Sequence, residues 1–270
     1  MSVILITGAS SGIGYQTAQD LARQGHTVYG AARRVDKITP LAKDGVKPLP
    51  LDVTSDASLQ AAVTTLIANE GRIDVLINNA GYGSYGAVED VTIAEAKKQF
   101  DVNLFGMARL TQLVLPYMRQ QHSGRIINTS SMGGRLVSYM GAWYHATKYA
   151  VEAFSDALRM ETKAFGIQVS LIEPGGIKTN WGFIAADHLV ASAQGGAYEQ
   201  QATKAATGMR RQYASKLLSQ PAVISKAIAK AVNQRHPRPR YLVGFGAKPL
   251  VFAKAILPTR LFDFIMMHAS

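Results

Sequence analysis

Tyr144 and Lys148 lie four residues apart, and Ser131 precedes the tyrosine by thirteen residues. Residues separated by four positions share one face of a helix, so this phenol and this ammonium can point into the same pocket. An ammonium next to a phenol favours the phenolate and lowers a pKa that is ordinarily about 10. The pair can then exchange a proton with a bound molecule, while the Ser131 hydroxyl holds an oxygen of that molecule. The three residues therefore predict a proton-transfer site.

A glycine-rich segment, Thr7 to Gly14, directly follows the apolar run Val3–Thr7 and precedes a helical pattern. Glycines there permit a tight turn and a close approach of the backbone to a pyrophosphate, and the start of a helix supplies free amides and a positive dipole end. A plain turn is the alternative, which the strand before and the helix after disfavour. The segment predicts a dinucleotide-binding site, whose contacts we expect from Gly8, Ser10, Ser11, Gly12, Ile13 and Gly14.

Two arginines, Arg33 and Arg34, follow the second expected strand, Thr27–Ala31, after an alanine at position 32. Dinucleotide sites selective for NAD commonly place a carboxylate here, about 20 residues on, to bind the ribose 2′-hydroxyl, whereas arginine suits a 2′-phosphate. The arginines therefore favour NADP(H) as the cofactor, with two solvated side chains as the alternative interpretation.

The chain has 270 residues, of which 47% are hydrophobic, enough for one large α/β domain with a sizeable core. It contains no cysteine, which excludes disulfides, thiolate metal sites and a cysteine nucleophile. No apolar run reaches the roughly 18–20 residues of a membrane-spanning helix. The N-terminal run Met1–Ile6 lacks a basic flank, so we interpret it as a first strand and expect a cytoplasmic protein.

The net charge of +11 lies almost entirely in the last quarter of the chain. Residues 1–197 carry 17 Lys and Arg against 16 Asp and Glu, whereas residues 198–270 carry 12 against 2. The alternatives are a solvated basic surface, an oligomer surface, and a surface that meets anionic lipid or a phosphorylated substrate. No nucleic-acid-binding motif or interleaved aromatic–basic pattern is present, so we expect no nucleic-acid partner.

Short apolar runs alternate with longer amphipathic stretches along the first two-thirds of the chain. This alternation predicts βαβ units, a parallel sheet with helices on both faces, right-handed crossovers, and a single domain spanning residues 1–270. The expected strands are Val3–Thr7, Thr27–Ala31, Val46–Leu51, Val75–Asn78, Arg125–Asn128 and Gln168–Ile172, and the expected helices cover residues 13–24, 55–70, 92–121 and 142–165.

The alternation ends after Pro174. Residues 176–220 form a connection of a length that compact domains rarely hold unless it is functional, and we expect a substrate-binding loop or lid there. Residues 221–270 are expected to form a helix that begins at Pro221, an edge strand at Tyr241–Val243, and an apolar, basic tail.

In this order and at these intervals, the motifs resemble the short-chain dehydrogenase/reductase family. The resemblance runs from Ser2 to about Thr179. It implies a Rossmann-type, doubly wound parallel α/β sheet of about seven strands in the order 3-2-1-4-5-6-7. The motifs that carry it are Thr7–Gly14, Asn78–Gly81, Asn103, Ser131 with Tyr144 and Lys148, and Pro174–Gly175.

The resemblance implies roles for four catalytic residues. Ser131 would hold and polarise a substrate carbonyl, and Tyr144 would be the general acid in reduction and the base in oxidation. Lys148 would lower the pKa of the tyrosine and bind the nicotinamide ribose, and Asn103 would hold a water in a proton relay. His145 adjoins Tyr144 but is turned about 100° away on a helix, which makes it structural or solvated. The other histidines are scattered, and we expect no metal site.

The same resemblance places further residues in the cofactor cleft. Asp52 and Val53, at the end of the third strand, would flank the adenine, and Thr179 would contact the nicotinamide amide. Beyond the glycine-rich segment and the two arginines, the expected cofactor contacts are Asp52, Val53, Asn79, Ala80, Gly81, Tyr144, Lys148, Pro174, Gly175, Ile177 and Thr179.

The segments Tyr29–Arg34 and Glu173–Thr179 look most like a subgroup of 17β-hydroxysteroid dehydrogenase-like, retinol dehydrogenase-like and 1-acyl-dihydroxyacetone-phosphate reductase-like proteins. This likeness implies an NADP(H)-dependent oxidoreductase that interconverts a carbonyl and an alcohol on a bulky apolar substrate, such as a steroid, a retinoid or a lipid ketone. The expected substrate contacts, which are alternatively ordinary core residues in several cases, are Ser131, Met132, Tyr82, Tyr139, Trp181 and Phe183.

Two other functions stay open at this point. One is the reduction of a phosphorylated lipid ketone at a membrane surface, which the basic C-terminal region would contact peripherally. The other is an NADPH sensor without turnover, although such proteins often lose the tyrosine or the lysine. By analogy with the family, we expect a homodimer or homotetramer formed through the helices near 103–121 and 142–165.

Overall fold

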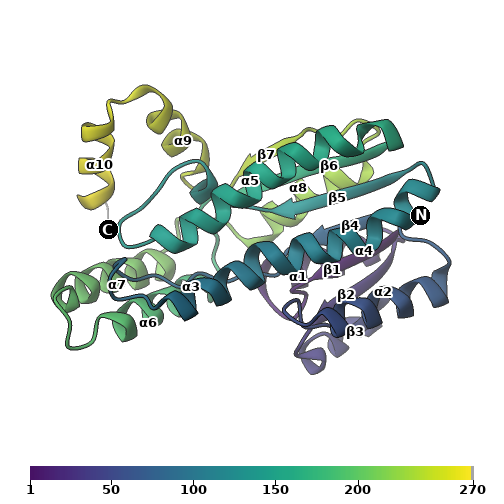
Figure 1. Cartoon of the computed structure of the whole chain (residues 1–270), viewed down its shortest axis with the longest axis horizontal. Coiled ribbons are helices and arrows are strands. Elements are labelled where there is room, and N and C mark those ends of the chain that lie inside the picture. Colours follow the sequence, from purple (N-terminus) through teal and green to yellow (C-terminus); the bar gives the residue numbers. More distant parts are fainter. Residues whose placement is uncertain (269–270) are drawn as a thin grey trace.

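The structure is built on a sheet of seven parallel strands in the order β3-β2-β1-β4-β5-β6-β7, which confirms the expected topology (Figure 1). The computed structural model describes residues 1–268. Each expected strand is present, with its ends shifted by no more than two residues. The strands are β1 (Val3–Thr7), β2 (Thr27–Ala32), β3 (Val46–Pro50), β4 (Val75–Asn78), β5 (Gly124–Thr129), β6 (Ile167–Pro174) and β7 (Arg240–Val243).

The central strands are buried along their whole length. Every residue of β1 and of β4 is buried. Helices cover both faces of a parallel sheet, so its central strands need apolar side chains on both sides. The edge strand β3 is only partly buried, which explains why its sequence signal is the weakest of the expected strands.

Helices pack on both faces of the sheet (Figure 1). On one face, Leu21 and Ile228 join a buried apolar cluster with the strands, and on the other face Leu66 and Leu110 do the same. The first face carries α1 (Gly12–Arg23) and α8 (Pro221–Asn233), and the second carries α2 (Asp56–Glu70), α4 (Gly106–Gln120) and α5 (Ala142–Thr162).

The expected helix over residues 92–121 contains an interruption. A π-helical turn, Asp101–Phe105, separates α3 (Ile93–Phe100) from α4. Single π-helical turns occur frequently at functional sites. Here the turn carries Asn103, whose side chain is buried.

The segment 176–220 is mostly helical, where the sequence predicts only a loop or lid. α6 (Trp181–Ala193) and α7 (Glu199–Ala214) lie side by side beyond the sheet (Figure 1). Buried alanines such as Ala186 and Ala206 lie in their shared apolar cluster and let the two backbones come close. Because α6 buries small residues and exposes Phe183 and Ile184, its apolar pattern has no clear helical period, and sequence reasoning missed it.

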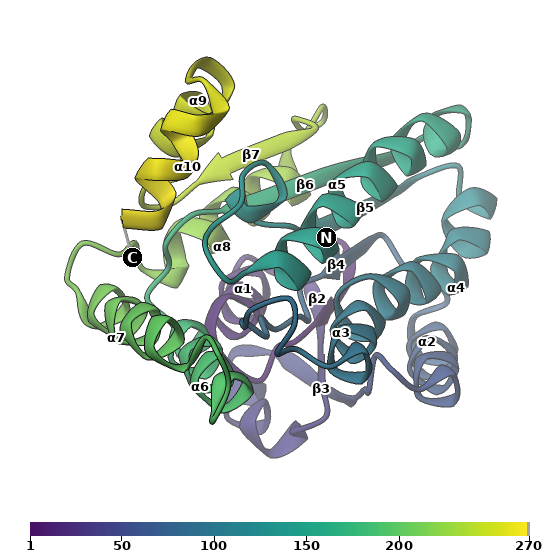
Figure 2. The same cartoon turned by 60° about the vertical axis from the view of Figure 1, so that its left-hand side comes forward.

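The chain after β7 forms two more helices, α9 (Ala247–Ile256) and α10 (Thr259–His268). They extend beyond the sheet at the end of the molecule where α6 and α7 also lie (Figures 1 and 2). Pro258 divides the two helices, as it divides the apolar tail of the sequence. Among residues 1–268, no helix combines the length and the apolar character that a membrane crossing requires.

We expect Gly106→Ala to destabilise the protein, although alanine is ordinarily the better helix residue by about 1 kcal/mol. A Cβ added to Gly106, at the start of α4, would lie 2.2 Å from the carbonyl oxygen of Val53. The backbone at Val53 cannot swing aside, so α4 must shift away from the turn after β3, at a cost of about 1–3 kcal/mol. Urea unfolding measures the change, and an unchanged or raised free energy of unfolding would contradict the expectation.

Candidate active site

The turn after β1 brings the glycine-rich backbone against the end of β4. Gly8 has a φ of 70°, and a Cβ added there would lie 2.9 Å from the Cα atom of Ala80. A Cβ added to Gly14 would lie 2.3 Å from the Gly8 carbonyl oxygen. Neither position accepts a side chain without a shift of backbone, so the turn stays bare. Ser11 precedes α1 without capping it through its side chain, which leaves the first amides of that helix available to an anion.

Thr7 ties two strand ends together at the point where the strand order reverses. Its hydroxyl accepts hydrogen bonds from the backbone amides of Asn79, at 3.0 Å, and Ala80, at 2.9 Å. Its carbonyl accepts another from the Asn79 side-chain amide at 3.0 Å. Ligands of open α/β sheets bind in the crevice at such a switch point. The structure therefore brings the expected cofactor residues after β1 and after β4 side by side.

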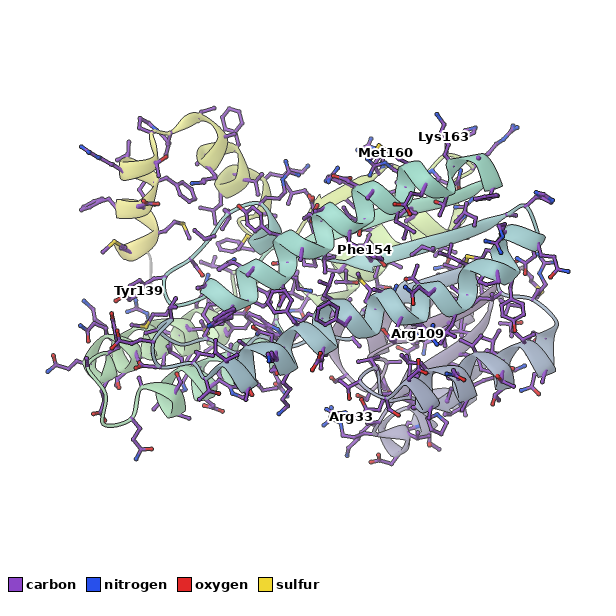
Figure 3. All side chains as sticks on the ribbon, viewed as in Figure 1. Arg33, Arg109, Tyr139, Phe154, Met160 and Lys163 are labelled. Carbon is purple, nitrogen blue, oxygen red and sulfur yellow. The ribbon has the colours of Figure 1, made fainter. Side chains whose placement is uncertain are left out.

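The two arginines after β2 lie at the same edge of the sheet, and both are exposed. A guanidinium nitrogen of Arg34 lies 3.4 Å from the Ser10 hydroxyl, and Figure 3 shows Arg33 reaching outward near β2 and β3. Hydrogen bonds from Thr54 lower the pKa of the Asp52 carboxyl, and the positive charge of Arg33 lowers it further. Among the described residues neither arginine forms a salt bridge, so both cations can meet an anionic ligand.

The turn after β6 reaches across to the glycine-rich segment. A Cβ added to Gly12 would lie 3.4 Å from the Thr179 methyl carbon. The Thr179 hydroxyl accepts a hydrogen bond from the backbone amide of Trp181 at 3.3 Å, and Ile177 is buried beneath the turn. The residues that follow Pro174 thus approach the glycine-rich segment near Gly12.

Ser131, Tyr144 and Lys148 come together where β5 ends and α5 begins. The Ser131 hydroxyl accepts a hydrogen bond from the Gly133 amide at 2.9 Å. Lys148 Nζ donates to the carbonyl oxygen of Thr129 at 2.9 Å and lies 6.0 Å from the centre of the Tyr144 ring. The phenol and the ammonium therefore share the pocket that their spacing predicts.

Burial acts in opposite directions on the two ionisable groups of this pair, whose residues are each only 7% exposed. It raises the pKa of Tyr144 to about 12, and the Ser131 hydroxyl opposes this shift. It lowers the pKa of Lys148 to about 8. At neutral pH the phenol therefore holds its proton and the lysine is mostly an ammonium, an arrangement suited to proton donation.

Asn103 holds the loop after β4 in place. Its side-chain oxygen accepts from the Tyr82 amide at 3.0 Å, and its nitrogen donates to the Tyr82 carbonyl at 2.9 Å and to the Thr147 hydroxyl at 3.1 Å. A Cβ added to Gly81 would lie 3.0 Å from Asn103 Oδ1 and 3.8 Å from Lys148 Nζ. Asn103 is thus near the ammonium, but its side-chain amide is engaged with protein groups. Its role in holding a water stays a prediction.

Aromatic side chains enclose the phenol. The indole of Trp181, at the start of α6, lies 5.0 Å from the Tyr144 ring centre, and the Tyr85 ring lies 5.6 Å from it. Tyr213, from α7, packs against the indole at 6.1 Å. The indole also covers Gly83, where an added Cβ would lie 2.3 Å from a ring carbon. Trp181 is among the expected substrate contacts, whereas no sequence motif marks Tyr85 or Tyr213.

The remaining aromatic residues expected at the substrate have other partners. The Tyr82 hydroxyl donates to a Glu95 carboxylate oxygen at 3.0 Å. Tyr139 is half-buried and packs against the apolar cluster of α6 and α7, at the end of the molecule shown on the left of Figure 3. Phe183 is exposed, with its ring 6.4 Å from Tyr213, so it flanks the enclosure of Tyr144 without lining its centre.

His145 is structural. Its ring makes hydrogen bonds to the Gly133 carbonyl at 2.8 Å and to the backbone amide and the hydroxyl of Ser138 at 2.9 Å. It thereby braces the turn that carries Ser131 and the half-buried Met132. Across the described residues, no group of His, Asp and Glu side chains is arranged to hold a metal ion.

A buried charged network lies behind Lys148, and no sequence motif marks it. Glu152 follows Lys148 by one helical turn, and Arg240 Nε lies 3.2 Å from a carboxylate oxygen of Glu152 and 3.2 Å from one of Glu173. Burial raises the pKa of Glu152 to about 7, the Glu173 charge adds to this shift, and Arg240 opposes it. Glu173 also pairs with Arg135, at 3.2 Å, whereas burial favours the protonated form of Glu152.

Residues 2–183 match the family model described as short chain dehydrogenase, and they include the cofactor crevice and the Ser131, Tyr144 and Lys148 cluster. The chain belongs to this family. The protein is therefore an oxidoreductase of the short-chain dehydrogenase/reductase type, as the sequence motifs predict.

Similar proteins cover nearly the whole chain. The chain is 40% identical to a 3-ketodihydrosphingosine reductase from Bacteroides thetaiotaomicron, over 94% of this chain and 91% of that protein. A crystal structure of a short-chain dehydrogenase from Streptomyces avermitilis is 33% identical, with a TM-score of 0.81, over 94% of this chain and 92% of that one. A metagenomic short-chain oxidoreductase in complex with NADP is 25% identical, with a TM-score of 0.71, over 90% and 96%. None of these three names the 17β-hydroxysteroid or retinol dehydrogenase-like subgroup, which stays a prediction.

We expect Glu152→Gln to remove a pH dependence of stability. The pKa of Glu152 in the folded protein, about 7, lies above the ordinary value of 4.5, so the folded state binds this proton more tightly than the unfolded chain. The stabilisation by the protonated Glu152 carboxyl is complete below pH 4.5 and is lost as the pH rises through about 7. The slope is at most about 1.4 kcal/mol per pH unit.

Urea unfolding between these two pH values measures the effect. The wild-type protein should lose more stability than Glu152→Gln as the pH rises. The exposed Glu161, on the same helix, provides a matched control, and Glu161→Gln should keep the wild-type dependence. Parallel stability curves for the wild type and Glu152→Gln would contradict the assignment of this proton to Glu152.

Proposed function

We propose that this protein is an NADP(H)-dependent oxidoreductase that interconverts a carbonyl and an alcohol on a bulky apolar substrate, with a lipid ketone as the favoured class. One observation carries the proposal: the catalytic phenol of Tyr144 lies beside Ser131 and Lys148 inside an enclosure made by Trp181 and Tyr85. The likeness to a 3-ketodihydrosphingosine reductase favours a long-chain lipid ketone over a steroid or a retinoid.

The crevice fits a phosphorylated dinucleotide. The turn at Gly8 and Gly14 packs so closely that a side chain at either position would displace it, and it leads to the uncapped start of α1, whose amides can bind a pyrophosphate. Arg33 and Arg34 offer two exposed cations at the end of β2, where a ribose 2′-phosphate would lie. The likeness to a short-chain oxidoreductase in complex with NADP supports this choice. When bound, the nicotinamide supplies the hydride.

The chain supplies orientation and the proton. The Ser131 hydroxyl, which the Gly133 amide fixes, would donate a hydrogen bond to the substrate carbonyl oxygen. In reduction the phenol of Tyr144 donates its proton to that oxygen as it becomes an alcohol, and in oxidation the phenolate takes the proton back. The Lys148 ammonium, fixed by the Thr129 carbonyl, stabilises the phenolate that forms.

The aromatic enclosure favours an apolar substrate and excludes water. The rings of Trp181 and Tyr85 cover the phenol and Tyr213 packs on the indole, so a substrate must replace contacts with aromatic carbon around the reacting oxygen. A compact polar substrate would lose hydration there without gaining hydrogen bonds.

A specific pocket supports a second candidate, the reduction of a phosphorylated lipid ketone. A surface pocket of about 260 Å³ lies between α7 and the turn before α9. Arg211 lines it together with Leu217, Leu218 and Phe245. A cation beside apolar side chains suits a lipid that carries a phosphate.

The assembly and the location remain proposals. Phe105, Tyr149 and Met160 are exposed along the helical segment that includes α4 and along α5, which supports a homodimer or homotetramer through these helices. Figure 3 shows Met160 on the outer side of α5. The cytoplasmic location stays a prediction from the sequence.

We expect Tyr144→Phe to lower kcat by about 10²- to 10⁴-fold, because the proton donor is lost. The affinity for NADPH should change little, because the phenylalanine keeps the ring and its packing. NADPH oxidation followed by absorbance, with a long-chain ketone and simpler aldehydes and ketones as substrates, measures the rate, and calorimetry measures cofactor binding.

Tyr149 lies on the same helix and is exposed, so Tyr149→Phe is a matched control that should keep the wild-type rate. A Tyr144→Phe protein that kept more than about a tenth of the wild-type rate would remove the tyrosine from its role. A wild-type protein that binds NADPH but oxidises it with no carbonyl compound would instead favour a sensor.

We expect Arg33→Ala to weaken NADPH binding by about 10- to 100-fold, because a charge-assisted contact to the 2′-phosphate is lost. NADH lacks that phosphate, so its affinity should barely change. Calorimetric titration of both cofactors measures the difference, and Arg34→Ala tests the neighbouring cation in the same way.

Arg72 provides a matched control, because it is an exposed arginine just before β4, at the opposite edge of the sheet from the crevice. Arg72→Ala should leave both affinities unchanged. Equal losses for NADPH and NADH in both Arg33→Ala and Arg34→Ala would exclude a 2′-phosphate site at these arginines.

A further inference from the structure

The outward face of α9 is apolar. Its exposed residues all lie within about 120° of the helix circumference. Phe252 is 65% exposed and Ile256 is 60% exposed. A helix on the surface of a water-soluble protein normally turns charged side chains outward and apolar ones inward. In α9 four of the five exposed residues are apolar, and the five are Lys248, Pro249, Phe252, Ala255 and Ile256.

The neighbouring helix α10 shows the same feature. Phe262 is its buried residue, with the Lys254 ammonium of α9 lying 4.9 Å from the centre of its ring. Leu261 and Ile265, one helical turn apart, are exposed. One aromatic ring thus fastens α10 to α9, while both helices expose large aliphatic or aromatic side chains. We call Phe252, Ile256, Leu261 and Ile265 the tail patch.

Cations flank the tail patch without acidic partners. Lys248 and Arg260 are exposed beside it, and Lys216 is exposed at the end of α7. Over residues 1–268, no salt bridge involves any of these three side chains. In the sequence, Asp263 is the only acidic residue after Glu199. These three cations therefore have no salt-bridge partner, and Asp263 is the one acidic residue on α9 and α10 within the described chain.

We infer that the tail patch is a docking surface for an anionic lipid bilayer. Each of the two helices has only 10 residues, too few to cross a bilayer but enough to lie in its interface with apolar side chains inserted. The flanking lysines and the arginine would meet lipid phosphates, since basic side chains near a membrane bind its negative surface. Burial of the apolar side chains would provide affinity for the bilayer, and the cations would select a bilayer with negative charge.

The position of the tail patch predicts which side of the protein would face the membrane. α9 and α10 extend beyond the sheet at the same end of the molecule as α6 and α7, which enclose the catalytic phenol (Figures 1 and 2). Phe245, just before α9, shares the pocket of about 260 Å³ with Leu217 and Arg211 at the end of α7. Docking would therefore present the proposed substrate side of the protein to the membrane, and not the side of β2 and β3, where the coenzyme is expected.

A second copy of the chain is a less suitable occupant. A symmetric self-contact at the patch would bring Lys248 and Arg260 close to the same cations of its partner, with only Asp263 as a local counter-charge. The exposed side chains of α4 and α5 offer a separate surface for self-association. The charge of the patch thus favours a negatively charged surface over a copy of itself.

Flotation of the full chain with vesicles tests the inference. Vesicles of phosphatidylcholine mixed with phosphatidylglycerol should carry the protein at low salt and release most of it at high salt, whereas vesicles of phosphatidylcholine alone should carry little. Replacement of Lys216, Lys248 and Arg260 by glutamine should weaken binding by about 100-fold, at about fivefold per charge. The double variant Phe252→Ser and Ile256→Ser should lose binding at all salt concentrations.

Lys163→Gln is a matched control, because its side chain is exposed just after α5, at the far end from the tail patch (Figure 3). It should bind vesicles as the wild type does. Turnover of a water-soluble carbonyl should be the same in all these proteins, which separates lost docking from lost folding and does not depend on the proposed lipid substrate.

Two outcomes overturn the inference. The first is an absence of salt-sensitive binding to the anionic vesicles by the wild-type protein. The second is a wild-type oligomer, measured by light scattering, that Phe252→Ser and Ile256→Ser convert to a smaller species while vesicle binding is unaffected. That result would assign the tail patch to a contact between copies of the chain.

Discussion

The close approach of the β1 and β4 strand ends is the constraint on which the rest of the structure depends. The Thr7 hydroxyl bonds the amides of Asn79 and Ala80, and Gly8 lies so near Ala80 that no side chain fits between them. This junction holds the bare turn after β1 against the loop after β4, at the point where the strand order reverses. Asn103 then fastens that loop near the Lys148 ammonium. The proton-transfer residues are therefore positioned from the same junction as the cofactor residues.

Burial is the largest cause of the pKa shifts of Tyr144 and Lys148. It keeps the proton on Tyr144, and it would remove the proton from Lys148 at a pH not far above neutral. The Glu152 carboxylate opposes that second effect and supports the ammonium. Glu152 is itself buried and resists ionisation, which Arg240 helps to offset. The charge state of the catalytic pair thus depends on a chain of groups that runs from α5 to the last strand of the sheet.

The sequence predicts those parts of the molecule in which local chemistry decides the structure. The glycine-rich turn and the meeting of Ser131, Tyr144 and Lys148 follow from motifs whose residue types are required by close backbone contact or by proton transfer. The strand order follows from the family resemblance that these motifs carry. Tyr85, Tyr213 and Glu152 could not be found in this way, because only tertiary packing brings them to the phenol or the ammonium. Helix α6 was missed for a related reason: it is apolar on most sides, so no periodic pattern marks it. Its packing on α7 relies on alanines, which carry little information about their neighbours.

The indole of Trp181 lies on the catalytic ring and over Gly83. In the folded protein the indole therefore occupies a position against the phenol that a ligand could otherwise take. The phenol is already shielded from water there. A substrate binds next to the phenol only if its own apolar surface replaces the contacts that the indole loses. A small alcohol or aldehyde lacks that surface, so it should react more slowly than a larger apolar molecule does. Discrimination among metabolites would then begin with competition against the protein's own side chain, before any hydrogen bond to the reacting oxygen forms.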